Sequence, residues 1–371
     1  MREPRHRFLF LSLSLVLTVG LVFFVLSAEN SQLKVCKVGC NFSSINAATE
    51  YVSPGDVVFV SAGTYRENIS INKDLTLEGS KEGDTLIKPK EEGHPLISVG
   101  PSDVEVTIKS ITLSGSRGSP SNKEKNVFPD GISITGVANL DLINVIILNN
   151  KKCGVRLLEE SKVNVLESSI ARNGVAACLG NKSELRLEES SISSNSLVLS
   201  GSATVNMVKT SVSNHDQVGL ELKDTTMAKI TGGKIGTCET CILLTDNAYL
   251  NLKGSTVSDA GDGVRLGGSS STEISGSEFT GCTSGIELRD YSQAKVISTK
   301  IRNNDHGVSL FNSADLRIQN CRIAFNDLGI RAEPNSQVRI RGCDIMFYNN
   351  FEKNIVGVQR KVEEDLQDRC K

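Results

Sequence analysis

Apolar residues recur along this chain in a pattern that repeats about every 22 residues. Ten units begin 20 to 23 residues apart, and the same four offsets in each unit hold an apolar side chain. The units start at Gly131, Gly154, Ala176, Ser196, Gly219, Cys241, Gly263, Gly285, Gly307 and Gly329. Such repetition is typical of a solenoid, whose units bury their apolar side chains against one another.

Within each unit, apolar and polar residues alternate, which predicts short β-strands. The unit from Gly263 has Val264 and Leu266, then Thr272 and Ile274, and finally Phe279 on a third segment. A period of two is the strand signature, and Ser, Asn, Gly and Asp between the segments favour turns. Three strands per unit, each pairing in parallel with its counterpart in the next unit, predict an all-β, right-handed parallel β-helix solenoid.

A leucine-rich repeat is the alternative solenoid, because its period also includes 22 residues. Its second half would need a helical or extended Leu-rich side, whereas this chain has a Gly-Val-Arg-Leu alternation at 154–157. The β-helix is therefore favoured. Two further columns are expected to form its corners: small residues at offset 14, and Asn at offset 19, whose amides can form a hydrogen-bonded ladder. The Asn column holds Asn150, Asn173, Asn195, Asn304 and Asn326.

The ends of the chain predict caps and an export segment. Arg2, Arg5 and Arg7 precede an uncharged run over 8–26, so residues 1–28 are expected to be a signal peptide or an uncleaved signal anchor. Residues 29–56 are predicted to form an N-terminal cap with a short helix over 43–52, and 57–350 the β-helix. Residues 351–371 are predicted to form a C-terminal capping helix or tail, with Ile355, Val358, Val362 and Leu366 on one helical face.

Composition narrows the possible partners. The 371 residues carry a net charge of −2, contain no Trp and have 5% aromatic residues, so nucleic acid is not an expected partner. We expect an extracytoplasmic protein that is secreted, periplasmic or anchored at the cell surface. We further expect a monomer that contacts a membrane only through the N-terminal segment, if that segment is uncleaved. With four His, neither a metal nor another cofactor is expected.

The stretch 42–79 resembles the opening of pectin-lyase-like β-helix proteins, and the later coils resemble carbohydrate-binding and sugar-hydrolysis repeats. The matching pieces are Phe42–Ile45, Pro54–Asp56, Gly63–Tyr65 and Leu75–Leu77. The resemblance covers nearly all of residues 42–350 and implies the fold. It implies polysaccharide as the partner only loosely, because this superfamily includes lyases, hydrolases, esterases, epimerases, adhesins and non-enzymes.

The catalytic motifs of the best-known members of that superfamily are incomplete here. Pectinesterases carry Gln-Asp inside the coils, but this chain has it at Gln367–Asp368, in the tail. Of the polygalacturonase motifs, the chain has only the fragments Gly261–Gly263 and Asp305–Gly307. Asp305 and His306 are therefore weak catalytic candidates. Asp262, Ser284 and His306 should stack in that order, which places Ser in the middle and argues against a triad.

Cations gather on successive strands near the C-terminal end: Lys295, Arg317, Arg339 and Arg341, here called the basic strip. Like charges on adjacent strands repel unless something anionic covers them. Two explanations stay open. A uronate-bearing polysaccharide could bind the strip, or acidic residues of the tail could fold over it, namely Glu352, Glu363, Glu364, Asp365 and Asp368.

The ten cysteines suggest two disulfide positions. Cys321 and Cys343 share one offset on adjacent coils, within disulfide range, although a stack of buried free thiols fits equally well. Cys36 and Cys40 could staple the N-terminal cap. Cys238–Cys241 has redox or zinc spacing but lacks the second pair that a zinc site needs.

Three functions compete. We favour non-catalytic recognition of polysaccharide by an exported protein, because no acid/base cluster is evident. A polysaccharide-processing lyase, hydrolase or epimerase is the first alternative, which leaves catalysis undecided. A structural or adhesive surface rod is the second.

Overall fold

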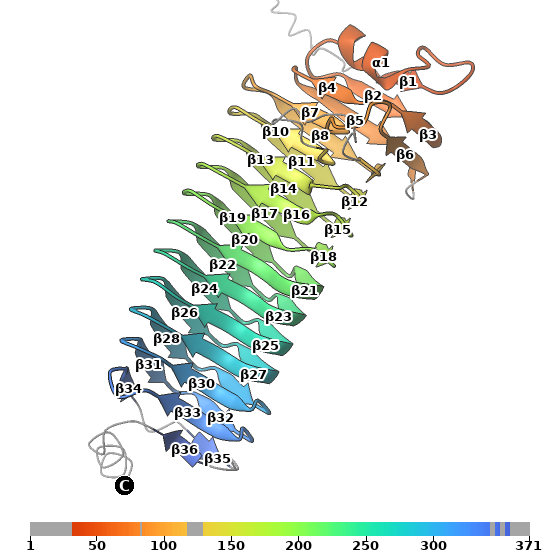
Figure 1. Ribbon diagram of the computed structural model, residues 1–371. Coiled ribbons are helices and arrows are strands. Elements are labelled where there is room, and N and C mark those ends of the chain that lie inside the picture. Colours follow the sequence, from red (N-terminus) through yellow and green to blue (C-terminus); the bar gives the residue numbers. More distant parts are fainter. Residues whose placement is uncertain (1–31, 82–83, 117–128, 342–345, 349–352, 357–371) are drawn as a thin grey trace, which may run out of the picture. The chain divides into compact units, whose positions relative to one another are not determined.

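The computed structural model is a right-handed parallel β-solenoid of about 13 coils (Figure 1), and it describes residues 32–81, 84–116, 129–341, 346–348 and 353–356. The chain divides into Met1–Asn30 and Ser31–Lys371, and every described residue belongs to the second unit. The polar segment within 117–128 and the apolar run over 8–26 lie outside the described residues. No helix in the described part is long and apolar enough to cross a membrane.

Sheet A contains one strand from each coil, and each strand pairs in parallel with the next. Neighbouring central strands are five residues long and pair residue for residue with no slip, as predicted from the equal coil lengths. In spatial order its strands are β1 (Gln32–Val35), β2 (Val57–Val60), β5 (Leu75–Gly79), β8 (Glu105–Lys109), β11 (Asn139–Ile143), β14 (Lys162–Leu166), β17 (Glu184–Glu188), β20 (Thr204–Val208), β22 (Met227–Thr231), β24 (Tyr249–Lys253), β26 (Ser271–Ser275), β28 (Gln293–Ile297), β31 (Asp315–Gln319) and β34 (Gln337–Arg341).

Sheet B closes each coil with two flanks that merge in the middle of the solenoid. The first flank contains β3 (Gly63–Arg66), β6 (Thr85–Lys88), β9 (Thr112–Ser114), β12 (Ile146–Leu148), β15 (Ser169–Ala171), β18 (Ser191–Ser193), β29 (Lys300–Arg302), β32 (Arg322–Ala324) and β35 (Met346–Tyr348). The second contains β4 (Ile69–Ile71), β7 (Ile97–Val99), β10 (Ile132–Ile134), β13 (Cys153–Leu157), β16 (Val175–Leu179), β19 (Leu197–Leu199), β30 (His306–Leu310), β33 (Leu328–Ala332) and β36 (Lys353–Val356). Four long strands belong to both: β21 (Ser211–Leu222), β23 (Lys234–Leu244), β25 (Thr256–Leu266) and β27 (Glu278–Leu288).

The predicted apolar columns form the core of the solenoid. One side chain of each column enters every coil, as Val264, Leu266, Ile274 and Phe279 do, and each of these four is completely buried. Parallel pairing places each column directly above the last, so Ile235 stacks on Val212 and Val257. A single contiguous core results, as expected for coils that cannot bury their apolar rows alone.

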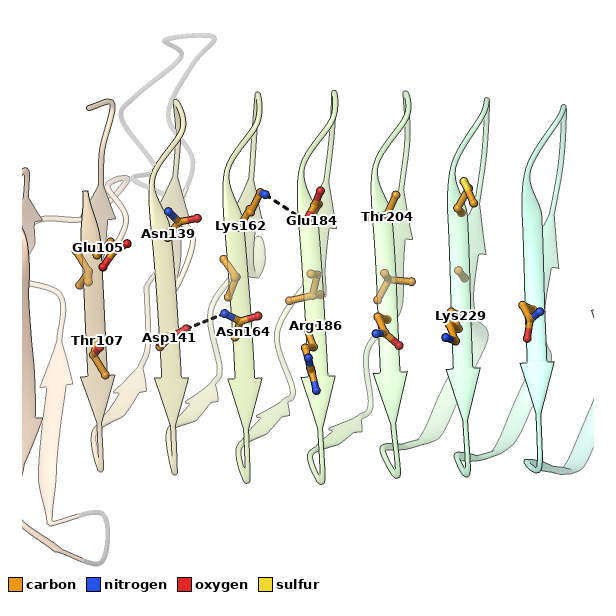
Figure 2. A pocket seen from close by; sticks show the side chains of 18 of the residues that line it. Glu105, Thr107, Asn139, Asp141, Lys162, Asn164, Glu184, Arg186, Thr204 and Lys229 are labelled. Carbon is orange, nitrogen blue, oxygen red and sulfur yellow. Dashed lines mark hydrogen bonds and ion pairs between the residues drawn. The ribbon is translucent and has the colours of Figure 1, made fainter. Parts of the chain in front are cut away.

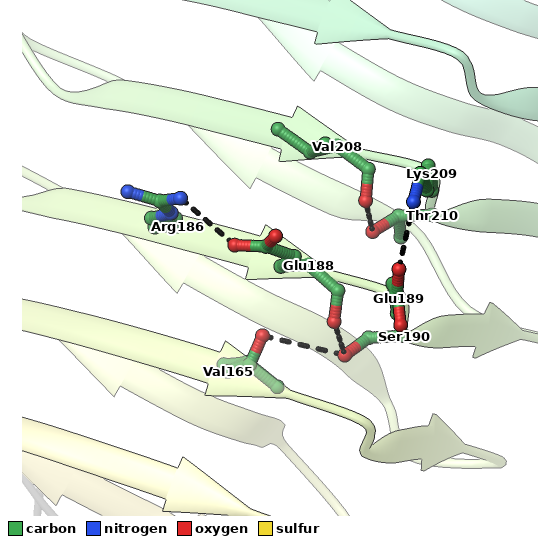
Figure 3. Close-up of polar contacts among 8 residues, drawn as sticks. All are labelled: Val165, Arg186, Glu188, Glu189, Ser190, Val208, Lys209 and Thr210. Atoms are coloured by element: carbon green, nitrogen blue, oxygen red, sulfur yellow. Dashed lines mark hydrogen bonds and ion pairs between the residues drawn. The ribbon is translucent and has the colours of Figure 1, made fainter.

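Hydroxyl groups at offset 14 make one corner of the coil, as the small residues there predicted. Ser190 Oγ accepts a hydrogen bond from Ser168 N one coil away and donates to the carbonyl oxygen of Glu188 at 2.8 Å, with Val165 O at 3.3 Å (Figure 3). The side chain thus satisfies backbone groups that the turn takes out of the sheet. Cys321 occupies the same column, and its Sγ accepts from Thr299 N at 3.5 Å.

The asparagine column at offset 19 forms the predicted buried ladder. Asn304 Oδ1 accepts from Cys282 N at 3.0 Å, and Asn304 Nδ2 donates to Asn326 Oδ1 at 3.0 Å. The left-handed backbone is not at these residues but one position earlier, for example at Asn303 with φ 56° and Phe325 with φ 57°. The ladder Asn therefore acts through its amide, and the preceding residue turns the chain.

A short helix covers the N-terminal coil. Helix α1 (Ile45–Tyr51) lies within the predicted 43–52 and buries Ile45 and Ala48 against the core. Ser44 is its N-cap, and the Glu67 carboxylate accepts from Ile45 N, Asn46 N and Ser44 Oγ, each at 2.9 Å. These contacts satisfy N–H groups that the first turn of a helix leaves unpaired.

The C-terminal helix does not begin where the sequence predicted. Residues Lys353–Val356 form strand β36, which pairs in parallel with β33 and places Ile355 opposite Ile330. One further coil, rather than a helix, thus follows β34. The parallel register with β33 extends the solenoid by a strand at the place where the apolar spacing predicted a helix. The rest of the predicted helix lies outside the described residues.

Candidate functional site

The outward face of sheet A carries an unbroken row of polar side chains. Each strand from β8 to β34 contributes the residue at its midpoint, and parallel pairing sets these residues side by side, about 4.8 Å apart. We call this set the central row: Thr107, Asp141, Asn164, Arg186, Asn206, Lys229, Asn251, Glu273, Lys295, Arg317 and Arg339.

A groove of about 840 Å³ lies over the first part of this row, from β8 to β24. Figure 2 shows side chains of neighbouring strands standing out into it. Asn164 Nδ2 donates to Asp141 Oδ1 at 2.8 Å, and Lys162 Nζ lies 3.6 Å from Glu184 Oε2 (Figure 2). These contacts join adjacent coils, so they hold the side chains in a fixed row.

The charges that line the groove balance. Three carboxylates face three cations, and the remaining polar lining consists of amides and hydroxyls. The charged lining residues are Glu105, Asp141 and Glu184, with Lys162, Arg186 and Lys229. Arg186 is also paired outside the lining set, with Glu188 at 2.8 Å (Figure 3). Such a surface offers many hydrogen-bond donors and acceptors and little net attraction for an ion.

The basic strip continues the same row toward the C-terminal coils. Lys295, Arg317 and Arg339 stand on β28, β31 and β34 and line a smaller hollow of about 170 Å³. The structure therefore brings three of the four predicted cations together. Arg341 lies on β34 in register with Gln319, and its side chain is outside the described part of the chain.

Acidic residues of sheet A lie within reach of this strip. Lys295 Nζ lies 2.9 Å from Glu273 Oε1, and Asp315 Oδ2 lies 3.7 Å from both Arg317 Nη2 and Arg339 Nη2. Glu273 is opposite Lys295 on the preceding coil, and Asp315 is two residues before Arg317 on β31. Neither is among the acidic tail residues predicted to cover the strip, and those tail residues lie outside the described part of the chain. Three cations facing two carboxylates leave the strip weakly positive.

The weak catalytic candidates lie elsewhere, on sheet B. His306 begins β30 and is half-buried, whereas Asp305 is exposed. The register stacks Asp262, Ser284 and His306 in the predicted order. Ser284 Oγ lies 3.0 Å from Ser309 Oγ, so this column is built as a coil-to-coil contact.

Sequence reasoning missed a buried charge network beside this column. Asp262 and Glu287 lie on adjacent coils, with Arg265 bonded to both and Arg289 Nε 2.6 Å from Glu287 Oε1. Burial, and then the Glu287 charge, raise the pKa of Asp262, while the arginines oppose that rise. In the sequence, Asp262 directly precedes one unit start and Glu287 is two residues after the next unit start. Asp130 and Arg156, which form an ion pair, have the same relation to their unit starts.

The cysteines include one disulfide that was predicted and one that was not. The predicted Cys36–Cys40 disulfide is present. Cys321 is a buried free thiol, as in the second of the two arrangements that the sequence left open for it. Its predicted disulfide partner, Cys343, lies outside the described residues. A second disulfide, Cys153–Cys178, joins adjacent coils at the same diagonal as Asp130–Arg156 and was not predicted. The described residues contain no group of three His, Cys, Asp or Glu placed to hold a metal ion.

Solved structures share this fold at low sequence identity. The A-module of the mannuronan C-5 epimerase AlgE4 of Azotobacter vinelandii is 14% identical, with a TM-score of 0.49, over 85% of this chain and 93% of that one. Tailspike protein 3 of bacteriophage CBA120 is 13% identical, with a TM-score of 0.54, over 82% of this chain and 57% of that one. Pectate lyase Pel9A is 11% identical, with a TM-score of 0.39, over 90% and 83%. At these identities the similarity concerns the fold alone.

No curated protein matches the chain in sequence. A family model described as a right handed beta helix region matches residues 130–261 and 219–359. These ranges overlap and together span more than half of the 371 residues. They contain the repeat units, the core columns and the ladders described above. The chain therefore belongs to the right handed beta helix family.

Proposed function

We propose that this chain is an exported, non-catalytic protein that binds a polysaccharide along the outward face of sheet A. The observation that carries the proposal is the central row, whose polar side chains repeat once per coil beside a groove of about 840 Å³. The row spacing of about 4.8 Å is close to the length of one sugar in an extended chain. A polymer lying across the strands would therefore meet a polar side chain with each successive residue.

The chemistry of the groove suits a hydroxyl-rich ligand. Asn164, Asn206 and Asn251 alternate along the row with Arg186 and Lys229, so donors and acceptors are available at every coil. Each exposed contact contributes on the order of 1 kcal/mol or less, so affinity comes from the length of the row. Where the polymer also carries uronate groups, the basic strip extends the site.

Export is supported by the disulfides. Cys36–Cys40 and Cys153–Cys178 are both bonded, and such bonds persist in oxidising compartments. Together with the predicted signal segment at 1–28, they favour a secreted, periplasmic or surface-anchored protein.

A direct test measures the binding of neutral and uronate polysaccharides to the full chain by calorimetry. Arg186→Ala should lower the affinity about fivefold, the equivalent of about 1 kcal/mol. Arg302→Ala is the matched control, because Arg302 is an exposed, ion-paired arginine on sheet B. Equal effects of the two variants, or no binding by either polymer class at low salt, would refute the groove as the site.

The strip is tested separately with uronate polymers. Charge reversal at Arg317 and Arg339 should abolish the part of uronate binding that weakens with added salt, while neutral polymers bind as before. If deletion of residues 357–371 increases uronate binding instead, the tail covers the strip in the intact protein.

Catalysis is the second candidate, favoured by one pair of groove residues. Glu105 and Asp141 stand on adjacent strands two positions apart, so the register places their backbones about 8 Å apart. Inverting glycosidases hold their two carboxyl groups about 6.5–9.5 Å apart, a separation that side chains on neighbouring strands of one face can reach. New reducing ends or unsaturated products that disappear in Asp141→Asn would establish an enzyme. Binding without product formation supports the non-catalytic function.

A further inference from the structure

The asparagine ladder is interrupted in the middle of the solenoid. Asn150, Asn173 and Asn195 fill it on one side and Asn304 and Asn326 on the other. Between them the same column holds four other buried residues: His215, Cys238, Ala260 and Cys282.

Direct strand pairing runs through this corner in the middle coils. Cys238 pairs in parallel with Ala260, which pairs with Cys282, whereas the β21–β23 pairing shifts register between His215 and Val218. Ala260 occupies the same column and has no polar side-chain atom. A thiol at this position of a coil is therefore not needed to satisfy the backbone.

Cys241 places a second thiol against Cys238. It stands in the column of unit starts, seven of which are glycine. A Cβ built on Gly219 would lie 3.4 Å from Cys238 Sγ, which shows that this column faces the ladder. Cys241 Sγ lies 2.7 Å from Cys238 Sγ, and the two residues are 0% and 7% exposed.

We propose that Cys238 and Cys241 are oxidised to a further disulfide bond inside the β-helix. Each thiol loses its proton, one S–S bond forms, and two electrons pass to a disulfide-bonded oxidant, which is released as a dithiol. The bonded pairs Cys36–Cys40 and Cys153–Cys178 support maturation of the chain under such conditions.

The geometry also selects this pairing over its competitor. Cys282 lies two coils from Cys238 with Ala260 between them, a backbone distance of about 9.6 Å that exceeds the reach of a disulfide. The hydrogen bond with Cys238, together with burial, raises the pKa of the Cys241 thiol. The thiolate is the reactive form, so oxidation must occur while the corner is still open during folding.

Peptide mapping of the full chain, produced in an oxidising compartment, tests the proposal. The protein is unfolded without reduction, its free thiols are alkylated, and the peptides are weighed. We expect the peptide holding Cys238 and Cys241 to be unlabelled and about 2 Da lighter than its reduced form, with Cys282 and Cys321 labelled. Labelling of both Cys238 and Cys241 in a sample whose Cys153–Cys178 bond is intact overturns the proposal, as does a Cys238–Cys282 bond.

Two single variants complete the test. Cys238→Ala repeats the residue that the column already accepts at Ala260, and it should make Cys241 fully labelled. Cys282→Ala is the matched control and should leave the Cys238–Cys241 peptide unlabelled. If Cys241 stays unlabelled in Cys238→Ala, its partner is another cysteine and the proposal fails. None of these results depends on what the groove binds.

Discussion

Replacing Asn304 by Ala should destabilise the protein by about 3–5 kcal/mol. Asn304 is 5% exposed, and its amide accepts from Cys282 N at 3.0 Å and donates to Asn326 Oδ1 at 3.0 Å and to Phe279 O at 3.3 Å. A buried N–H without an acceptor costs about 1–3 kcal/mol, and each lost side-chain hydrogen bond adds about 1 kcal/mol.

Two measurements follow this change. The urea midpoint of unfolding, followed by circular dichroism, should fall in Asn304→Ala. Hydrogen exchange of a peptide spanning 278–288 should become faster, because the Cys282 amide loses its acceptor. Asn312→Gly is the control: Asn312 is an exposed turn residue with φ 58° that donates to Asp290 Oδ1 at 3.1 Å, and Gly adopts this φ without strain, so the change should cost less than about 1 kcal/mol.

An unchanged Asn304→Ala variant would refute this reasoning. If Asn304→Ala leaves both the midpoint and the exchange of this peptide unchanged, the corner has closed by direct main-chain pairing, as it does at Ala260. The ladder amide would then be dispensable, and the energetic argument for it would be wrong.

Three other changes should alter stability for distinct reasons. Ile235→Asp places a charge at a position that is 2% exposed and should abolish soluble, folded protein, measured by yield and circular dichroism; a normally folded variant would contradict the core assignment. Cys153→Ser should cost about 3 kcal/mol in urea unfolding, because the disulfide closes a loop with a sequence separation of 25; an unchanged midpoint would contradict this. Because the folded pKa of Asp262 is raised above its ordinary 3.8, the folded state takes up this proton first. The free energy of unfolding therefore rises as the pH falls through the interval between 3.8 and the raised folded-state pKa. Asp262→Asn should remove this pH dependence from urea midpoints measured across the interval, and an unchanged dependence would contradict the assignment.

Equal coil length explains why so much of the fold could be predicted from the sequence. When every unit has about 22 residues, a residue and its counterpart one unit later must stack. The core positions of Ile235 and Val257 and the Asn304–Asn326 ladder therefore follow from counting. The basic strip was found in the same way, because Lys295, Arg317 and Arg339 share one offset.

Contacts that cross between offsets could not be counted in this way. Cys153 meets Cys178 and Asp262 meets Glu287 at a separation of 25 residues, three more than the period. Each contact joins the residue before one unit start to the residue two after the next unit start, so it depends on the directions of side chains at two different offsets. A periodic pattern pairs only equal offsets and does not specify such a contact.

The sequence by itself determined the solenoid, its inward columns and the placement of the cations on one face. Only the tertiary structure decided that Asp315 lies between Arg317 and Arg339, and that Cys238 and Cys241 bring their sulfur atoms together. The physical reason is that periodicity fixes where a Cα lies along the stack. The direction of a long or turning side chain depends on the neighbours that its own coil places around it.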